Sequence, residues 1–442
     1  MRHRKSSDDR ASFTHHRTCP LSVRLFLRDL TGFAGANLAR SLLPFLLMPV
    51  LTAKLGTTGY GTLALLEVTI LIFTPLLLFN SPALISTRYY QLDADGRRQT
   101  ITASLALAFI LTLSAQAALL IVGKRVAIAL GLPDSFYLLL PLFILVRIIT
   151  TYITGIYQIQ QRAALYGAYS VGMLACDLGL SLLFVVQFDW GYKGRLLGSH
   201  LAMFIASIVG LRYLWREHLL GGRLNGTVLR DILRYGFPLI PHALGGVVLA
   251  MSSRYLIEYY KGAAAVGMYA ATYQLASALL LIGTTINQVW SISLFKLLSE
   301  GVATNRRTIR RLFAMNIAFL FVATIAIYSL KDVLFGVFLH SEFRAALPLF
   351  PWLLIGFLFQ SLYFIFVNFD FYDGSTTRIG VVTLGAAALN ILLNVLWLPR
   401  FGISGAAWAA TASMAIYFFA VAGRVVLFST SFRSLWTREG NE

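Results

Sequence analysis

Twelve apolar stretches, each long enough to cross a bilayer, alternate along the chain with short polar or basic segments. They cover residues 30–52, 61–84, 100–123, 136–159, 164–186, 195–214, 235–258, 266–290, 312–331, 347–369, 379–398 and 405–428. About 20 residues at a rise of 1.5 Å per residue span the hydrocarbon core as an α-helix. The pattern therefore predicts an all-α polytopic membrane protein with twelve transmembrane helices.

Four pairs of glycines recur in matching order in the two halves of this pattern. They are Gly56 and Gly61 after the first stretch, Gly191 and Gly194 before the sixth, Gly262 and Gly267 after the seventh, and Gly402 and Gly405 before the twelfth. Because six is even, two six-helix halves would share one orientation and be related by an axis along the membrane normal. We predict a basic N-terminal segment (1–29), a six-helix bundle (30–214), a linker (215–234), a second six-helix bundle (235–428) and a tail (429–442).

The composition supports a membrane protein, since only 13% of the residues are charged and 57% are hydrophobic, against about 25% charged in a soluble domain. The net charge of +18 comes from Lys and Arg in the loops, mostly those on the side of the N-terminus. This asymmetry predicts that both termini are cytoplasmic. The basic residues do not form the single patch that binding of nucleic acid requires. Cys19 lies in the basic N-terminal segment and Cys176 in the middle of an apolar stretch, so we expect no disulfide framework.

The N-terminal segment is polar and basic, and the apolar stretch that follows it is too long for the core of a cleavable signal peptide. We expect the first stretch to act as an uncleaved signal anchor.

We single out three arginines inside the apolar stretches, where a cation costs about 2.5–3.5 kcal/mol on insertion scales and usually faces a polar interior. Arg40 lies near the middle of the first stretch, and we expect it to face a cavity and bind substrate. Arg254 lies in the outer third of the seventh, where it either binds substrate or snorkels to the surface. Arg147 lies in the fourth, at a depth similar to that of Asp177 in the fifth, so an ion pair is the leading interpretation of these two. Glu67 either pairs with Arg254 or titrates.

The sequence resembles the Wzx-type oligosaccharide flippases of the superfamily that also contains the MATE multidrug transporters. The resemblance is carried by ARSLLPFLLMPVLTAKLGTTGYG (39–61), STRYYQ (86–91), YGFPLIPHALGGVVLAMSSRYLIEYYKGAAAVGMYAATYQLAS (235–277) and FGISGAAWAATAS (401–413). It implies a V-shaped, MATE-like pair of six-helix bundles in a bacterial inner membrane. The implied function is to move polyprenyl-pyrophosphate-linked sugar repeat units from the inner to the outer leaflet by alternating access, for export of surface polysaccharide. One departure is Ser253, where that family often has an acidic residue before the arginine.

Such a substrate fits the arginines, because a diphosphate loses its hydration in hydrocarbon and a guanidinium binds phosphate through two hydrogen bonds. The candidate substrate-binding residues are therefore Arg40, Arg254, Arg147 and Arg88. Arg88, at the cytoplasmic end of the second stretch, either reflects topology alone or receives the pyrophosphate from the inner leaflet. Candidate ion-coupling residues are Glu67 and Asp177, and the sequence leaves open whether H⁺ or Na⁺ is used.

Two other functions remain open at this stage. A MATE-like cation or drug antiporter would need an acidic site, whereas the spans hold three arginines beside Glu67, Asp177 and Glu258. A membrane-embedded polysaccharide polymerase or glycosyltransferase would need a long outer loop with catalytic groups. We expect no enzymatic activity, cofactor or metal. The expected partners are a polyprenyl-pyrophosphate-linked oligosaccharide and membrane lipids, together with the polymerase and glycosyltransferases of the same pathway, and no nucleic acid.

Overall fold

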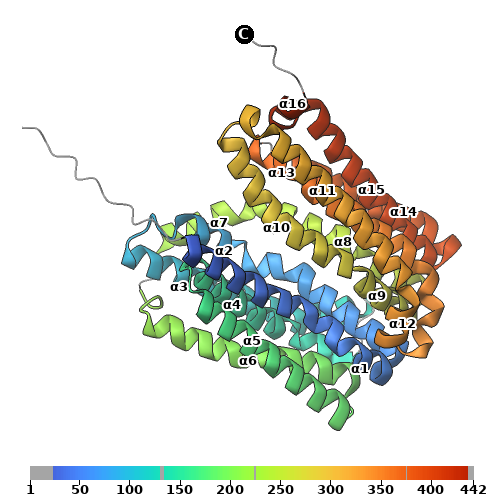
Figure 1. The fold of residues 1–442 in the computed structure, drawn as a ribbon. Helices are drawn as coiled ribbons and strands as arrows, with labels where there is room; N and C mark the ends of the chain where they lie inside the picture. Colours follow the sequence, from blue (N-terminus) through green and yellow to red (C-terminus); the bar gives the residue numbers. More distant parts are fainter. Residues whose placement is uncertain (1–22, 130–133, 223–224, 375, 437–442) are drawn as a thin grey trace, which may run out of the picture.

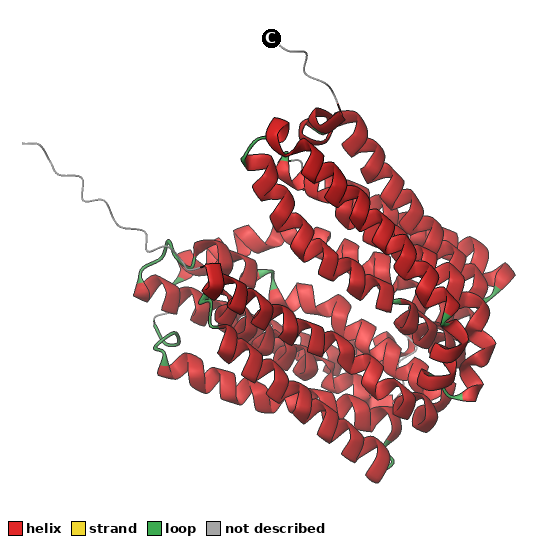
Figure 2. Ribbon diagram, viewed as in Figure 1, coloured by secondary structure: helices red, strands yellow, loops and turns green. Residues whose placement is uncertain are grey.

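Helices make up almost all of the described chain, which contains no strand (Figure 2). The computed structural model describes residues 23–129, 134–222, 225–374 and 376–436, apart from the side chains of 23–34, 36–40, 129, 134–136, 242, 303 and 376–378. The all-α membrane architecture predicted from the sequence is confirmed.

The first group of helices lies together in the lower half of Figure 1. It consists of α1 (Val23–Leu78), α2 (Ser81–Arg88), α3 (Ala94–Ala129), α4 (Leu140–Ile159), α5 (Ala163–Leu182) and α6 (Gly191–Arg216). A 3₁₀ turn at Asp134–Leu139 leads into α4, and a π-helical turn at Leu183–Gln187 extends α5. The long helix α1 bends at Gly56, and Phe79 and Asn80 end it with positive φ angles before α2 begins.

The second group lies at an angle to the first and is reached through α7 (Gly226–Gly236), which packs on α2 and α3. It consists of α8 (Ile240–Lys261), α9 (Ala263–Ala276), α10 (Ala278–Ser299), α11 (Val302–Ser329), α12 (Lys331–Phe338), α13 (Phe350–Tyr372), α14 (Thr376–Phe401), α15 (Ile403–Phe428) and α16 (Thr430–Trp436). Short 3₁₀ segments at Phe237–Leu239 and Ser341–Leu349 precede α8 and α13. The division into two six-helix bundles at 214 and 235 remains a prediction.

The number of spans differs from the twelve that we predicted. Within the described residues, ten helices are long and apolar enough to cross a membrane, or up to eleven if Gly226–Leu239 and Ala243–Lys261, which meet at a bend of 46°, form one span. The main reason is that the predicted span 30–52 and most of the predicted span 61–84 follow each other within α1, where Gly56, with a non-helical φ of 59° and ψ of −174°, separates two helical segments at a kink.

The segment after residue 428, predicted to be only a polar tail, contains α16. Phe432 and Leu435 of this helix are buried against the second group. Arg306 and Arg310 of α11 donate hydrogen bonds to the carbonyls of Ser434 and Leu435, which satisfies acceptors that a helix C-terminus leaves free. At least residues 430–436 of the predicted tail are therefore folded.

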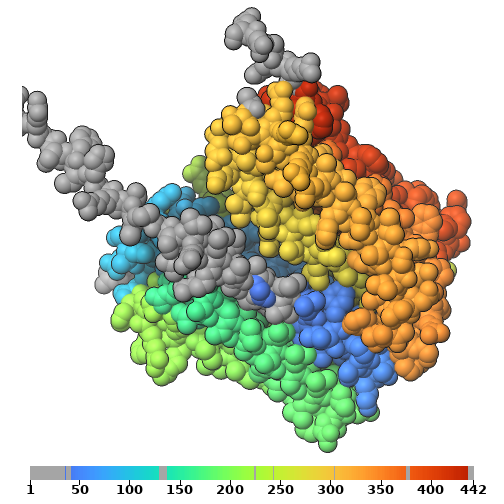
Figure 3. Space-filling model, viewed as in Figure 1, coloured from blue at the N-terminus to red at the C-terminus, as the bar shows by residue number. Residues whose placement is uncertain are grey.

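The two groups of helices meet at one end and separate toward the other (Figure 1). At the joined end α1 packs along α9, and α12 also contacts α1. In the space-filling view a hollow separates the yellow surface of α10 from the first group and closes where the blue surface of α1 meets the orange surface of α12 (Figure 3). The chain thus forms a V whose apex lies at the bend of α1.

The repeated glycines explain how the joined end closes. Gly56 and Gly262 have φ angles of 59° and 80°, a region that residues with a Cβ rarely adopt. Five residues later, Gly61 and Gly267 lie face to face across the two groups. A Cβ on Gly61 would lie 1.9 Å from the carbonyl oxygen of Ala263, and a Cβ on Gly267 would lie 1.9 Å from that of Thr57. In each pair the first glycine makes the turn and the second allows the backbones to touch.

Candidate functional site

A cavity of about 110 Å³ lies between the two groups, close to the joined end of the V. Residues of α1, α6, α8 and α9 line it. The polar lining residues are Tyr60, Glu67, Arg195, Arg254 and Gln274, and the apolar ones are Pro44, Leu47, Leu51, Leu63, Ala64 and Ala270. The cavity therefore brings together charged side chains that are up to 187 positions apart along the chain, all at membrane depth.

Arg254 is the cation that this cavity leaves most available. Its side chain is only 9% exposed, and its guanidinium carbon lies 5.3 Å from the centre of the Tyr273 ring. Its Nε atom is buried without a hydrogen-bond partner, and no carboxylate of the described residues lies within 4.0 Å of it. A buried donor without a partner requires an explanation, and an anionic ligand in the cavity provides one.

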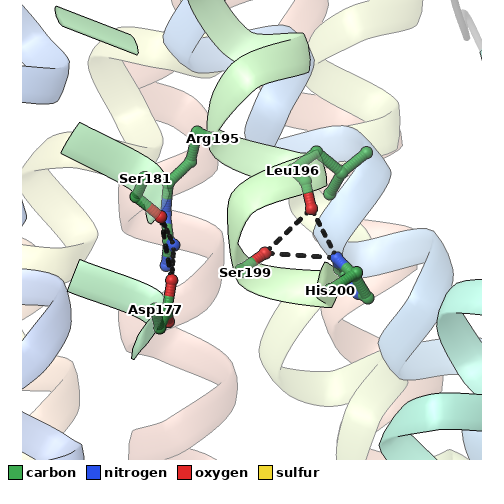
Figure 4. Close-up of polar contacts among 6 residues, drawn as sticks. All are labelled: Asp177, Ser181, Arg195, Leu196, Ser199 and His200. Atoms are coloured by element: carbon green, nitrogen blue, oxygen red, sulfur yellow. Dashed lines mark hydrogen bonds and ion pairs between the residues drawn. The ribbon is translucent and has the colours of Figure 1, made fainter. Parts of the chain in front are cut away.

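Arg195, in contrast, is held by an acid. Its Nη1 atom donates hydrogen bonds to Asp177 Oδ1 and to Ser181 Oγ, which itself donates to Asp177 Oδ1 at 2.8 Å (Figure 4). Both charged side chains are about 10% exposed or less. The helices α5 and α6 approach closely here, because a Cβ on Gly198 would lie 2.8 Å from the Ser181 backbone nitrogen. The pair orients Arg195 at the cavity wall.

In the structure Asp177 pairs with Arg195, whereas we expected it to pair with Arg147. Arg195 was not a candidate, because it is the first residue of a predicted apolar stretch and charges at such ends usually belong to the loops. Asp177 is ten residues before the end of the π-helical turn that completes α5, and the long side chain of Arg195 reaches it from the start of α6.

His200, one turn after Leu196 on α6, is also drawn in Figure 4. Its Nδ1 lies 2.8 Å from the Leu196 carbonyl oxygen and 3.1 Å from Ser199 Oγ, and its ring lies 4.2 Å from that of Phe143. These are contacts of a packed side chain on the far side of α6 from Asp177. They give His200 no role in the cavity.

Glu67 is the acidic residue of the cavity wall. Arg195 and Arg254 line the same cavity, yet neither forms an ion pair within 4.0 Å with Glu67 in the described part of the chain. Of the two alternatives for Glu67, the pair with Arg254 is therefore not formed in this conformation. The cavity wall carries two guanidinium groups and one carboxylate, with the charge of Arg195 balanced from behind by Asp177.

The other predicted site residues lie outside this cavity or outside the described side chains. Arg40 lies on α1 four residues before the lining residue Pro44, and its side chain is not among those described. Arg147 is half-buried on α4. Arg88 ends α2 at the open end of the V, where it forms an exposed ion pair of 3.3 Å with Asp231 of α7. Of the predicted site residues, Glu67 and Arg254 line the cavity, and Asp177 contacts the cavity residue Arg195.

A second buried ion pair, between Asp370 of α13 and Arg424 of α15, was not found from the sequence. Asp370 is only 3% exposed, but it directly follows a predicted apolar stretch. Charges at the ends of such stretches usually reach water, so position alone does not distinguish a buried pair from a solvated one.

Replacing Asp177 by asparagine is expected to destabilise the fold by about 3–5 kcal/mol, because it leaves a buried arginine without its counter-charge. Thermal unfolding of the purified protein in detergent measures this. The matched control is Asp189→Asn, since Asp189 forms an exposed contact of 3.8 Å with Lys54, which is worth about 0–1 kcal/mol. Equal midpoints for the two variants would show that the Asp177–Arg195 pair does not stabilise the protein.

Comparison with known proteins places these features in a wider group. Residues 26–291 match the family model described as polysaccharide biosynthesis protein. An uncharacterised membrane protein of Haemophilus influenzae is 22% identical over 400 residues, which cover 86% of this chain and 94% of that protein.

Two solved structures have a similar fold over most of both chains. The lipid II flippase MurJ in an inward closed conformation superposes with a TM-score of 0.72 at 10% identity, covering 91% of this chain and 89% of that one. A MATE family multidrug resistance transporter of the MOP superfamily, in an inward-facing conformation, gives a TM-score of 0.66 at 13% identity, covering 94% and 96%. The predicted MATE-like fold is confirmed.

Proposed function

This chain belongs to the polysaccharide biosynthesis protein family, and on that premise we propose that it is a flippase for lipid-linked oligosaccharides. It moves polyprenyl-pyrophosphate-linked sugar repeat units from the inner to the outer leaflet of a bacterial inner membrane. The observation that carries the proposal is the buried guanidinium of Arg254, which faces a cavity between the two groups of helices without a carboxylate partner among the described residues.

The diphosphate is the part of the substrate that is most difficult to move across the membrane. The polyprenyl tail can remain in lipid, but a diphosphate in hydrocarbon loses its hydration at a cost of many kcal/mol. A cavity that offers guanidinium groups replaces part of that hydration with charge-assisted hydrogen bonds, and an arginine keeps its charge at every relevant pH. Arg254 supplies one such group, and Arg195, which lines the same cavity, supplies another.

The V shape supports alternating access as the mechanism. Because Lys and Arg accumulate on the side of the N-terminus, we assign the open end of the V and both termini to the cytoplasm. The contact between Gly61 and Gly267 then closes the outer end. A head group would enter from the inner leaflet and leave after the two groups separate at the glycines.

We assign supporting roles to the remaining charged candidates. Arg40 provides a third cation on the path of the diphosphate, and Arg88 receives the head group at the cytoplasmic mouth. Arg147 lies deeper along α4. Glu67 couples transport to a cation, because neutralising it by protonation would leave the cavity arginines to the diphosphate. Glycosyltransferases of the same pathway would supply the lipid-linked saccharide, and the polymerase would consume it.

The fold alone would also allow export of a cationic drug, and Glu67 is an acid that such a cation could bind. Arg254, which pairs with no carboxylate of the described residues within 4.0 Å, opposes this function, because it would repel a cation. A binding measurement separates the two possibilities.

Undecaprenyl diphosphate is expected to raise the unfolding midpoint of the purified protein, because a ligand at 100 times its Kd stabilises by about 2.7 kcal/mol. Arg40→Ala should lose most of this shift. Arg400→Ala is the matched control, since Arg400 is an exposed arginine on α14, and it should respond like the unchanged protein. A shift with tetraphenylphosphonium and none with the diphosphate lipid would replace the flippase by a cation exporter.

A further inference from the structure

A second hollow, of about 500 Å³, lies between α2 and α4 near the open end of the V. Its polar lining residues are Ser86, Thr151, Tyr152, Thr154 and Gln158, and the described lining contains no charged side chain. Thr151 lies eight residues before Ile159, the end of α4, so the hollow extends about 12 Å inward from the open end. The hollow is thus wide, and its described lining is uncharged and partly polar, although it extends to a depth at which the outer surface of the protein would contact lipid.

The polar residues of α4 form one stripe. Arg147, Thr151, Thr154 and Gln158 follow one another at intervals of four, three and four residues, which places them on one face of the helix. Thr151 and Gln158 are exposed and line the hollow. Polar side chains at membrane depth usually face a water-filled space rather than lipid. The stripe therefore leads from the cytoplasmic end toward Arg147 along a wet wall.

The packing of α4 shows which way this stripe points. Ile153 lies on the opposite face and packs against Gly210 of α6, where a Cβ would lie 2.0 Å from the Ile153 Cδ1 atom. In Figure 1, α6 forms the edge of the first group that lies farthest from the second group. The stripe therefore points away from α6 and toward α2, whose residues form the other wall of the hollow.

The hollow can accept hydrogen bonds from a ligand at several points. The hydroxyls of Ser86, Thr151 and Thr154 donate to carbonyls one turn earlier in their own helices, at 2.7–2.8 Å, so their oxygen lone pairs remain available. The Gln158 amide has no hydrogen bond to any described residue and offers two donors and an acceptor. Tyr90, which is 72% exposed, donates to the Ile159 carbonyl at the rim.

From this arrangement we infer that the hollow between α2 and α4 binds the first sugars of the lipid-linked saccharide, and that it selects neutral, hydroxyl-rich sugars. The inference rests on the proposed flippase function. Neutral hydroxyls and an amide satisfy sugar hydroxyls, whereas a charged sugar would enter a site whose described lining offers no counter-charge. The exposed Tyr90 ring at the rim can cover a sugar face. Arg147, one turn beyond Thr151, places a cation where the stripe continues toward the membrane centre.

The test compares two probes on the full-length protein in detergent. One is the polyprenyl-diphosphate saccharide fraction extracted from source cells that lack this gene, and the other is undecaprenyl diphosphate. The unchanged protein should bind the saccharide fraction more tightly. Thr151→Val and Gln158→Leu should each reduce that affinity about fivefold, as expected for one lost neutral hydrogen bond, and leave undecaprenyl diphosphate binding unchanged.

The matched control is Thr150→Val. Thr150 is the neighbouring threonine on α4, its side chain is 5% exposed, and it does not line the hollow. It should retain the affinities of the unchanged protein for both probes. A purely structural role of Thr151 would lower binding of both probes together and overturn the inference.

Two further outcomes are decisive. If the unchanged protein binds both probes equally, or if the Thr151 and Gln158 variants keep the preference for the saccharide fraction, the inference is overturned and the flippase proposal stands. If the unchanged protein binds neither probe, the proposed function itself is overturned.

Discussion

Arg254→Ala is expected to lower transport of the lipid-linked saccharide about 30- to 3,000-fold while the protein remains folded in the membrane. Truncating a buried charged group that binds an opposite charge costs about 2–5 kcal/mol, and each 1.4 kcal/mol is a factor of ten. The fold should tolerate the change, because no carboxylate of the described residues is paired with Arg254 within 4.0 Å and would be left behind. The main structural loss is the contact with the Tyr273 ring, worth about 0.5–2 kcal/mol.

The conservative variant sharpens this experiment. Arg254→Lys keeps the positive charge but cannot form the paired hydrogen bonds of a guanidinium, so its transport should fall between those of Arg254→Ala and the unchanged protein. Export of surface polysaccharide by cells that carry each variant, normalised to the amount of protein in the membrane, provides the measurement. Full export by Arg254→Ala would remove the cavity from the substrate path.

Gly61→Ala is expected to open the outer end of the V. The new Cβ would lie 1.9 Å from the Ala263 carbonyl oxygen and 2.7 Å from the Gly267 nitrogen, and these are backbone atoms that cannot rotate away. Overpacking of this kind costs about 1–3 kcal/mol. The closed conformation would lose that much stability, which shifts its ratio to the opened conformation about 5- to 150-fold. Transport should fall because the conformation that receives substrate from the cytoplasm becomes rare.

The distance between one spin label at the bend of α1 and another at the start of α9 reports this change. Gly246→Ala serves as the control, since Gly246 lies in α8 and a Cβ there would have no other atom within 4 Å. It should leave the distance distribution of the unchanged protein intact. An unchanged distribution for both Gly61→Ala and Gly267→Ala would contradict the assignment of this contact as the outer seal.

The glycine pairs show what could be predicted from the sequence and where prediction ends. Their recurrence after matching apolar stretches indicated two related halves, and Gly56 and Gly262 do break the helices with positive φ. The sequence did not show that Gly61 and Gly267 touch, because that contact joins segments about 200 residues apart. It also predicted two spans in the region of α1, and Gly56 does separate two helical segments there.

The charged residues show the same limit. Arg254 was a candidate because a lone arginine inside an apolar stretch is expensive in lipid, and it does line the central cavity. The partner of Asp177 was misassigned, because Arg147 lies at a similar depth in the adjacent predicted span. The long side chain of Arg195 reaches Asp177 from the start of α6 instead. Asp370 and Arg424 were missed for the same reason, since each lies near the end of an apolar stretch. Which charges pair depends on helix packing, which a single sequence does not show.

Transfer of a lipid-linked saccharide across a membrane tests the central claim most directly. Purified protein would be reconstituted into liposomes with the saccharide fraction from source cells that lack this gene, and a saccharide-cleaving enzyme added outside would report the lipids that reach the outer leaflet. We predict that the unchanged protein makes the saccharide of the inner leaflet accessible and that Arg254→Ala does not. Equal accessibility with the unchanged protein, with Arg254→Ala and with protein-free liposomes would contradict the claim that this chain is a flippase.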